Sequence, residues 1–261
     1  MKITYLGTCS GTEPMKGMHH TSLLIEVSGS YYWFDAGECA AHTAYTTLGT
    51  EVLNTRALFI SHPHIDHTGG LANVLALFWK LTGMHKQKLQ VDNTLKVFFP
   101  GLEVFGAVKL VLTGSPDHKL PFKIDENEVT DGLLYEDGKV KVYAMHNKHL
   151  GEDGTKGWHS YSYLIEAEGK RVVFSGDVAS SEELIPLVEG GCDLLIHETG
   201  HHQVGSVCEF AERMKVGALR FTHHGRAIIN GRAEMQELVK AHSDGSGISM
   251  KICSDGDTDE I

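Results

Sequence analysis

Four side chains that can ligate a metal ion occur within six residues, directly after the apolar run 57–60. They are His62, His64, Asp66 and His67. The first two are separated by one residue and the second two are adjacent, so a loop can present the pairs to two different points. Imidazole and carboxylate ligands together suit zinc, manganese or iron. The spacing therefore predicts a site for two neighbouring divalent cations.

Later in the chain, further candidate ligands follow short apolar runs. His146, Asp177 and His223 each come at the end of such a run, and Gly176 allows the sharp turn that projects the Asp177 carboxylate. Apolar runs of this length indicate strands, and strand ends that carry ligands align along one edge of a sheet sandwich. Asp35 also ends a run, but we expect it to accept hydrogen bonds from loop amides.

Each of these three ligands has a competing interpretation. His149 lies three residues after His146, and His146 is preferred because it continues the apolar alternation before it. His223 is preferred to His224 because it is nearer the end of the strand. Asp177 could instead be the N-cap of a following helix.

The patterns between the strands are helical, which predicts an α/β architecture. Helices are expected over 70–81, 181–188, 208–215 and 233–241, and the stretch 86–137 has few landmarks. With no internal repeat or change in composition, residues 1–261 are expected to form a single domain. Its acidic C-terminal segment, about 254–261, is expected to be a loose tail.

Composition limits the classes of partner and compartment. The formal net charge of −11 argues against a broad basic surface for nucleic acid. The five cysteines are scattered, without a Cys-x-x-Cys pair, which favours a reduced cytoplasmic protein over a disulfide framework. We see no long apolar signal segment and no stretch that approaches a membrane span, so no membrane partner is predicted.

The chain resembles the metallo-β-lactamase superfamily. The signature of that superfamily, His-x-His-x-Asp-His followed in order by a His, an Asp and a last His, is present here. The resemblance is greatest to the ribonuclease Z and phosphodiesterase branch, and it covers roughly residues 1 to 225. The branch-like segments are Tyr-Leu-Gly-Thr-Cys-Ser-Gly-Thr-Glu-Pro at 5–14, Phe-Asp-Ala-Gly-Glu at 34–38 and Asp-Leu-Leu-Ile-His-Glu-Thr at 193–199.

This resemblance implies an αββα sandwich with the metal site at one edge, between the two sheets. It implies two divalent metal ions, with zinc preferred and manganese or iron as alternatives. One ion would be bound by His62, His64, His146 and Asp177, and the other by Asp66, His67, His223 and Asp177.

The resemblance also implies hydrolysis by a metal-bound hydroxide, because divalent ions lower the pKa of bound water towards about 7. Asp66 could orient this nucleophile. His201 or His202, held by Glu198, could protonate the leaving oxygen. The sequence does not choose between these two histidines.

Departures from ribonuclease Z decide which substrate is preferred. Residues 223–226 read His-His-Gly-Arg in place of His-x-Ser-x-Arg-Tyr, and no Gly/Pro-rich tRNA-binding arm is visible. We therefore predict a phosphodiesterase that acts on a small-molecule or nucleotide-like ester, and tRNA is disfavoured as a partner. The alternatives are a carboxylic ester, thioester or lactone hydrolase, a ribonuclease Z-like RNA endonuclease, and a metal-binding protein without catalysis. A homodimer is left open.

Overall fold

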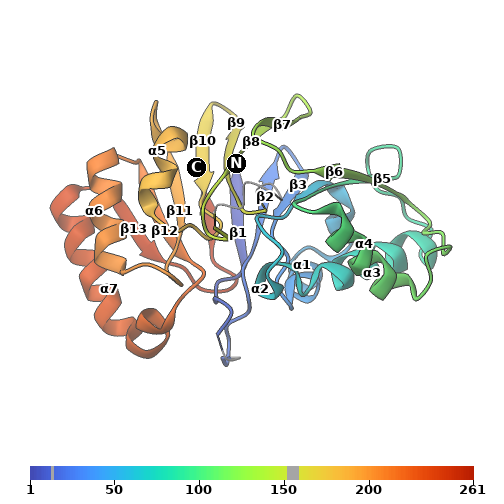
Figure 1. Cartoon of the computed structure of the whole chain (residues 1–261), viewed down its shortest axis with the longest axis horizontal. Coiled ribbons are helices and arrows are strands. Elements are labelled where there is room, and N and C mark those ends of the chain that lie inside the picture. Colours follow the sequence, from blue (N-terminus) through green and yellow to red (C-terminus); the bar gives the residue numbers. More distant parts are fainter. Residues whose placement is uncertain (13–14, 152–158) are drawn as a thin grey trace.

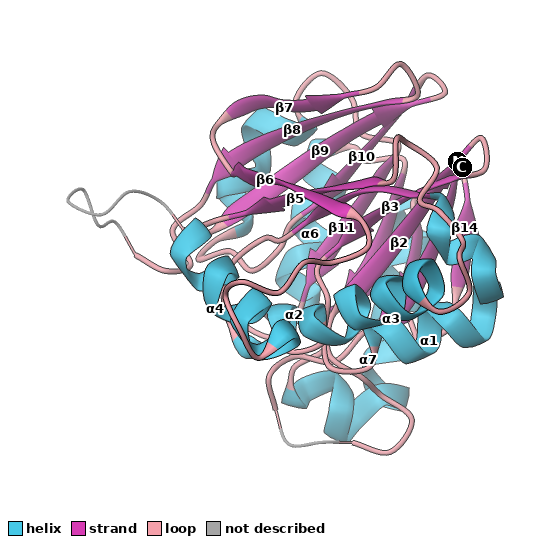
Figure 2. Ribbon diagram, turned by 90° about the vertical axis from the view of Figure 1, so that its right-hand side faces the viewer, coloured by secondary structure: helices cyan, strands magenta, loops and turns pink. Residues whose placement is uncertain are grey.

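The computed structural model describes residues 1–12, 15–151 and 159–261. Within these residues, fourteen strands form two seven-stranded sheets that pack face to face (Figures 1 and 2). The first sheet has the order β14-β1-β2-β3-β4-β5-β6, and the second has the order β13-β12-β11-β10-β9-β8-β7.

The strands of the first sheet are β1 (Lys2–Gly7), β2 (Ser22–Val27), β3 (Ser30–Phe34), β4 (Thr55–Phe59), β5 (Thr94–Phe99), β6 (Lys123–Glu128) and β14 (Thr258–Glu260). Those of the second are β7 (Gly132–Glu136), β8 (Val140–His146), β9 (Tyr161–Ala167), β10 (Lys170–Phe174), β11 (Leu194–Glu198), β12 (Ala218–Thr222) and β13 (Ser249–Ile252). Neighbouring strands from β3 to β6 are parallel, as are those from β10 to β13, so their carboxyl ends meet along one edge of each sheet.

Helices cover the outer face of each sheet. The first sheet is flanked by α1 (Ala40–Leu48), the 3-10 helix η1 (Gly49–Asn54), α3 (Leu71–Gly83) and α4 (Leu102–Thr113). The second is flanked by the 3-10 helix η2 (Ser181–Leu184), α5 (Ile185–Val188), α6 (Val204–Met214) and α7 (Arg226–Ser246). The expected αββα sandwich is confirmed.

Alternation along the strands explains the layers. In β9, Tyr163 and Ile165 point into the core between the sheets, whereas Leu164 packs against the helices of the second sheet. The central residues 163–165 are apolar on both faces because both faces are covered there. The aromatic rings of Phe34 and Phe59 stack at 4.9 Å in the central core, directly before the loops that carry the functional residues.

The helices predicted from the sequence are present, but one expectation about the C-terminus is wrong. The acidic segment is not a loose tail, because β14 pairs with β1 and Lys2 lies opposite Glu260. Asp255 accepts hydrogen bonds from Thr8 N and Oγ1, at 2.9 and 2.7 Å. Backbone pairing and these partly buried contacts fix a segment whose charge alone suggested a solvated tail. In the described part of the chain, no helix combines the length and the apolar character that crossing a membrane requires.

Candidate metal centre

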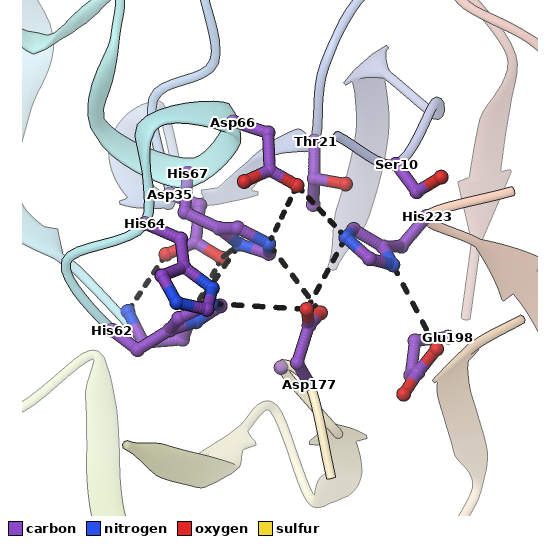
Figure 3. Close-up of polar contacts among 12 residues, drawn as sticks. Ser10, Thr21, Asp35, His62, His64, Asp66, His67, Asp177, Glu198 and His223 are labelled. Carbon is purple, nitrogen blue, oxygen red and sulfur yellow. Dashed lines mark hydrogen bonds and ion pairs between the residues drawn. The ribbon is translucent and has the colours of Figure 1, made fainter. Parts of the chain in front are cut away.

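The predicted ligands gather at the carboxyl ends of three strands. The segment with His62 and His67 follows β4, Asp177 follows β10, and His223 follows β12 (Figure 3). Gly176 has φ of 56°, and a Cβ there would lie 2.8 Å from the carbonyl oxygen of Tyr161. The sharp turn expected before Asp177 therefore needs glycine.

A short helix turns the second half of the hexapeptide away from the first. Helix α2 (Ile65–Thr68) carries Asp66 and His67, while His62 and His64 lie in the extended segment before it. His67 is fully buried, and its Nδ1 donates to Asp35 Oδ2 over 2.7 Å. Asp35 Oδ1 also accepts from the backbone N–H of Ser61 at 2.7 Å, so its predicted role as an acceptor in the loop agrees with the structure.

One group of ligand atoms forms around Asp66, His67, His223 and Asp177. His223 Nε2 lies 3.1 Å from Asp66 Oδ2 and 3.3 Å from Asp177 Oδ2. His67 Nε2 lies 3.5 Å from Asp66 Oδ2 and 3.4 Å from Asp177 Oδ1. Ligands about 2 Å from one tetrahedral ion are roughly 3.3 Å apart, so these separations suit a zinc-sized cation.

A second group corrects one expectation. The side chain next to His62 and His64 is that of His149, whose Nε2 lies 3.3 Å from His64 Nδ1 and 3.7 Å from Asp177 Oδ2. His146 ends β8 in the predicted alternation, but its Nδ1 is bonded to Asp131 Oδ2 at 2.5 Å. The turn after β8 brings His149 next to His64 and Asp177. His149 therefore takes the position expected for His146.

The donor atoms fit a pair of divalent ions. His67 Nε2 and Asp177 Oδ1 are buried and have no hydrogen-bond partner among the described residues. They face each other across 3.4 Å. Buried polar atoms are normally satisfied, so two that converge without a hydrogen-bond partner fit a position where a cation would bind. Asp177 lies in both groups, with one oxygen towards His67 and the other towards His62.

The helix-cap interpretation of Asp177 does not hold. The 3-10 helix η2 is capped by Ser180, which forms a capping box with Glu183. The other competing choice was between His223 and His224. His224 is buried with its Nε2 2.7 Å from the carbonyl oxygen of Cys253, and thus has a structural partner.

The electrostatics of the groups favour positive charge at their centre. Burial alone would raise the pKa of Asp66, but contacts with His223 and His67 hold that pKa well below its usual range. Burial lowers the pKa of His62 well below its ordinary value. Burial would also lower the pKa of His223, yet Asp177 and Asp66 raise it to about 9. Bound divalent ions would supply, next to these carboxylates, the positive charge that protonated histidines otherwise provide.

The predicted acid group borders the same cavity. Glu198 is buried and accepts from His201 Nδ1 at 3.0 Å and from His201 N at 2.9 Å. His202 Nε2 also lies 3.3 Å from Glu198 Oε1, but it donates to the carbonyl oxygen of Val178 at 3.0 Å. Only His201 of this pair lines the cavity among the described residues. The cavity has a volume of about 300 Å³ and is lined by Ser10, Gly11, Thr12, His64, Asp66, Asp177, Gly200, His201 and His223.

Sequence reasoning missed the side of the cavity formed after β1. A Cβ at Gly11 would lie 2.9 Å from Asp66 Oδ2, and one at Gly200 would lie 2.5 Å from His223 Nδ1. Both glycines therefore allow backbone to pass close to the ligands. The signal was present in the branch-like segment 5–14, but it did not show that Ser10 and Thr12 face the metal ligands.

Comparisons with known proteins agree with this geometry. The chain is 24% identical to ribonuclease Z of Mycobacterium marinum over 273 residues, covering 96% of this chain and 95% of that protein. It is similar to the metallo-β-lactamase fold protein YhfI from Bacillus subtilis, with a TM-score of 0.77 at 17% identity and coverage of 100% and 99%. The short form of human tRNase Z gives a TM-score of 0.72 at 18% identity, with the same coverage.

The predicted metallo-β-lactamase superfamily, its ribonuclease Z-like branch and a phosphodiesterase-like hydrolase are thereby confirmed. A family model gives the closer assignment. The model of the anti-Pycsar protein Apyc1 matches residues 1–211, which include the hexapeptide, Asp177 and the His201 loop. The chain belongs to the family of the anti-Pycsar protein Apyc1.

Proposed function

We propose that this protein hydrolyses a small or nucleotide-like phosphodiester with the help of two divalent ions. The observation that carries the proposal is the position of Asp177. Its Oδ2 lies 3.7 Å from both His62 Nε2 and His149 Nε2, and 3.3 Å from His223 Nε2. Its Oδ1 lies 3.4 Å from His67 Nε2. A carboxylate in this position can share its two oxygens between two ions.

The ligand assignment follows from the two groups. One ion would be held by His62, His64, His149 and Asp177, and the other by Asp66, His67, His223 and Asp177. Zinc is our first choice because imidazole and carboxylate dominate the set, and manganese or iron would accept the same donors. A bound pair would activate water at neutral pH and stabilise charge on the phosphoryl oxygens.

The protein's own residues would orient the reaction. Asp35 accepts from His67 Nδ1, so this ring is held with its Nε2 available to the ion before substrate enters. His201 borders the cavity with its Nδ1 on Glu198, which leaves Nε2 to deliver a proton to the leaving oxygen. Contact with Glu198 raises the pKa of His201, and the ring is therefore more often in its protonated, acidic form.

The small size of the substrate rests on the cavity and on charge. A volume of about 300 Å³ suits a small ligand. The net charge of −11 opposes a long phosphate backbone. A ribonuclease Z-like RNA endonuclease is the second candidate, because the curated relatives aligned over most of this chain are ribonuclease Z proteins. We also propose a cytoplasmic location, which the five free cysteines support.

A panel of four substrates tests the proposal. The metal-reconstituted protein is given bis(p-nitrophenyl) phosphate, p-nitrophenyl acetate, a lactone and a precursor tRNA, each with and without chelator. We expect chelator-sensitive turnover of the phosphodiester above that of the other three. Preferential turnover of the acetate or the lactone would overturn the phosphodiesterase proposal in favour of a carbonyl hydrolase.

A further inference from the structure

A second cluster of metal-ligand side chains lies outside the catalytic cavity. It comprises His19, His20, Glu38 and Cys39, which we call the outer cluster. One ligand atom each from His19, Glu38 and Cys39 lies within 4.8 Å of the other two. His20 Nδ1 lies 2.9 Å from the second carboxylate oxygen of Glu38, so another imidazole borders these three donors. None of these side chains belongs to the two groups around Asp177.

We propose that the outer cluster binds a third divalent ion of the zinc type. Imidazole, carboxylate and thiolate are the three side-chain ligands that zinc takes in proteins, and the His20 imidazole beside Glu38 is the candidate for the fourth position of a tetrahedral site. Glu38 places one oxygen 3.3 Å from His19 Nδ1 and the other 2.9 Å from His20 Nδ1. Ion pairing alone would explain why the Glu38 carboxylate lies between the imidazoles of His19 and His20. It would not explain the Cys39 thiol beside them, which a metal ion could use as a ligand.

The backbone holds these donors in place without the ion. His19 N–H donates to Asp255 Oδ2 at 2.6 Å, and His20 N–H donates to Glu38 Oε2 at 2.9 Å. The backbone at His20 lies so close to Gly37 that a Cβ on Gly37 would be 2.4 Å from the carbonyl oxygen of His20. A site whose backbone is already fixed loses little conformational entropy when it binds a ligand.

The location of the outer cluster gives the ion a structural purpose. His19 and His20 end the connection between β1 and β2, whose first residues include Ser10 and Thr12 of the catalytic cavity. Glu38 and Cys39 follow the loop of Asp35, which orients His67. An ion in the outer cluster would therefore join the two segments that flank the catalytic groups, and would stabilise one wall of the cavity.

Cobalt substitution tests the outer cluster separately from the catalytic groups. Thiolate bound to Co²⁺ gives a charge-transfer absorption band in the near ultraviolet, and the catalytic groups contain no cysteine among their described members. We expect this band when Co²⁺ is added to the metal-free full chain. Cys39→Ser should abolish it, and His19→Ala should reduce it strongly. His42→Ala, an exposed histidine on α1, and Cys192→Ala are matched controls that should retain it.

Two further measurements keep the outcome decisive. Wild-type protein should bind about one more equivalent of Zn²⁺ than Cys39→Ser, by elemental analysis. Zn²⁺ should also protect Cys39, the only half-exposed thiol of the five, from alkylation by iodoacetamide. If Cys39→Ser fails to fold by circular dichroism, Glu38→Gln replaces it, because glutamine keeps an acceptor for His20 N–H.

The absence of a charge-transfer band in the wild type, or a band unchanged in Cys39→Ser, would overturn the proposal that the outer cluster binds an ion. The four side chains would then form only an ion-pair network. Because the spectral band requires sulfur, this result does not depend on whether the catalytic groups bind metal or cleave a phosphodiester.

Discussion

His67 donates from Nδ1 to Asp35 over 2.7 Å, and this contact aims its Nε2 between Asp66 and Asp177. A carboxylate on the far nitrogen fixes both the tautomer and the orientation of a ligating imidazole. The Asp35 carboxylate is fully buried and also accepts twice from Ser61. The geometry of the ion site formed by Asp66, His67, His223 and Asp177 therefore depends on Asp35, which is not one of its ligands.

We expect Asp35→Asn to weaken metal binding by about 10–100-fold, because asparagine replaces one of the two acceptor oxygens with an NH2 donor and the ring of His67 loses its fixed tautomer. Isothermal titration of metal-free protein with Zn²⁺ measures this change. Asp117→Asn, an exposed change in a loop, is the control. An affinity equal to that of the wild type would show that His67 is held by packing alone.

His149→Ala and His146→Ala distinguish the two candidate histidines. Loss of His149 should reduce bound metal from about two equivalents towards one and lower phosphodiester turnover at least about 100-fold, since a ligand contributes more than the residues that support it. His146→Ala should retain both ions, because its Nδ1 is on Asp131. Elemental analysis and initial rates provide the comparison. The reverse pattern would restore the assignment made from strand alternation.

Asp177→Ala should disturb both ions together. The carboxylate lies in both groups and is 2% exposed, so its removal deprives each ion of a ligand. We expect metal content below one equivalent and loss of hydrolysis, with the far-ultraviolet circular dichroism spectrum preserved. Ser180→Ala, which removes the true cap of η2, should cost about 1 kcal/mol of stability and leave metal content intact. Two ions retained by Asp177→Ala would refute its bridging position.

Substrate size is tested by salt as well as by rate. The protein should hydrolyse bis(p-nitrophenyl) phosphate much faster than it processes a precursor tRNA, and the first rate should change little between 50 and 200 mM salt. Binding a phosphate backbone releases counterions and is therefore steeply salt-dependent. Efficient, salt-sensitive cleavage at the 3′ end of the tRNA would favour the RNA endonuclease instead.

Acid stability should depend on Asp137, which joins the two sheets. Its Oδ2 accepts from Tyr32 at 2.7 Å and from Tyr135 at 2.9 Å. Burial alone would raise the pKa of Asp137, but these bonds and two backbone N–H groups lower it. A lowered pKa in the folded state stabilises the fold above the unfolded value of about 3.9. This contribution is lost as the pH falls through the folded value.

Asp137→Asn should therefore cost about 1.5–3 kcal/mol at pH 7, the usual range for hydrogen bonds to a charged group. The difference from the wild type should shrink below about pH 4, where the wild-type carboxyl also becomes neutral in the unfolded chain. Urea unfolding at pH 7 and pH 3.5 measures both values. A difference that is the same at both pH values would point to a packing defect.

Local patterns in the sequence were sufficient to predict the α/β class and to select most of the side chains that the fold brings together, whereas the αββα sandwich followed from the family resemblance. Apolar runs define strands, and His62, His64, Asp66 and His67 lie within one loop and one helical turn. The choice of His146 failed for a tertiary reason. The alternation does run through Val140, Val142 and Ala144, but the core ends at Ala144. Asp131, from the segment before β7, then accepts hydrogen bonds from the backbone N–H and the imidazole of His146.

The position of His149 depends on a turn that no periodicity describes. Asn147 is buried in that turn; its Nδ2 donates to Ser162 Oγ, and its side-chain Oδ1 accepts from His149 N–H at 3.1 Å. The C-terminal strand was missed for a similar reason. Its three residues are polar, and their place in the first sheet is set by pairing with β1, more than 250 positions away.

The distance along the chain between His223 and Asp66, 157 residues, also bears on how the protein matures. Contacts between residues far apart in sequence form late, because long loops must close first. The ions can therefore find a complete set of ligands only after both sheets have docked. A stalled or clipped chain would carry the hexapeptide but not the full site, and tightly bound metal would then report on completed folding.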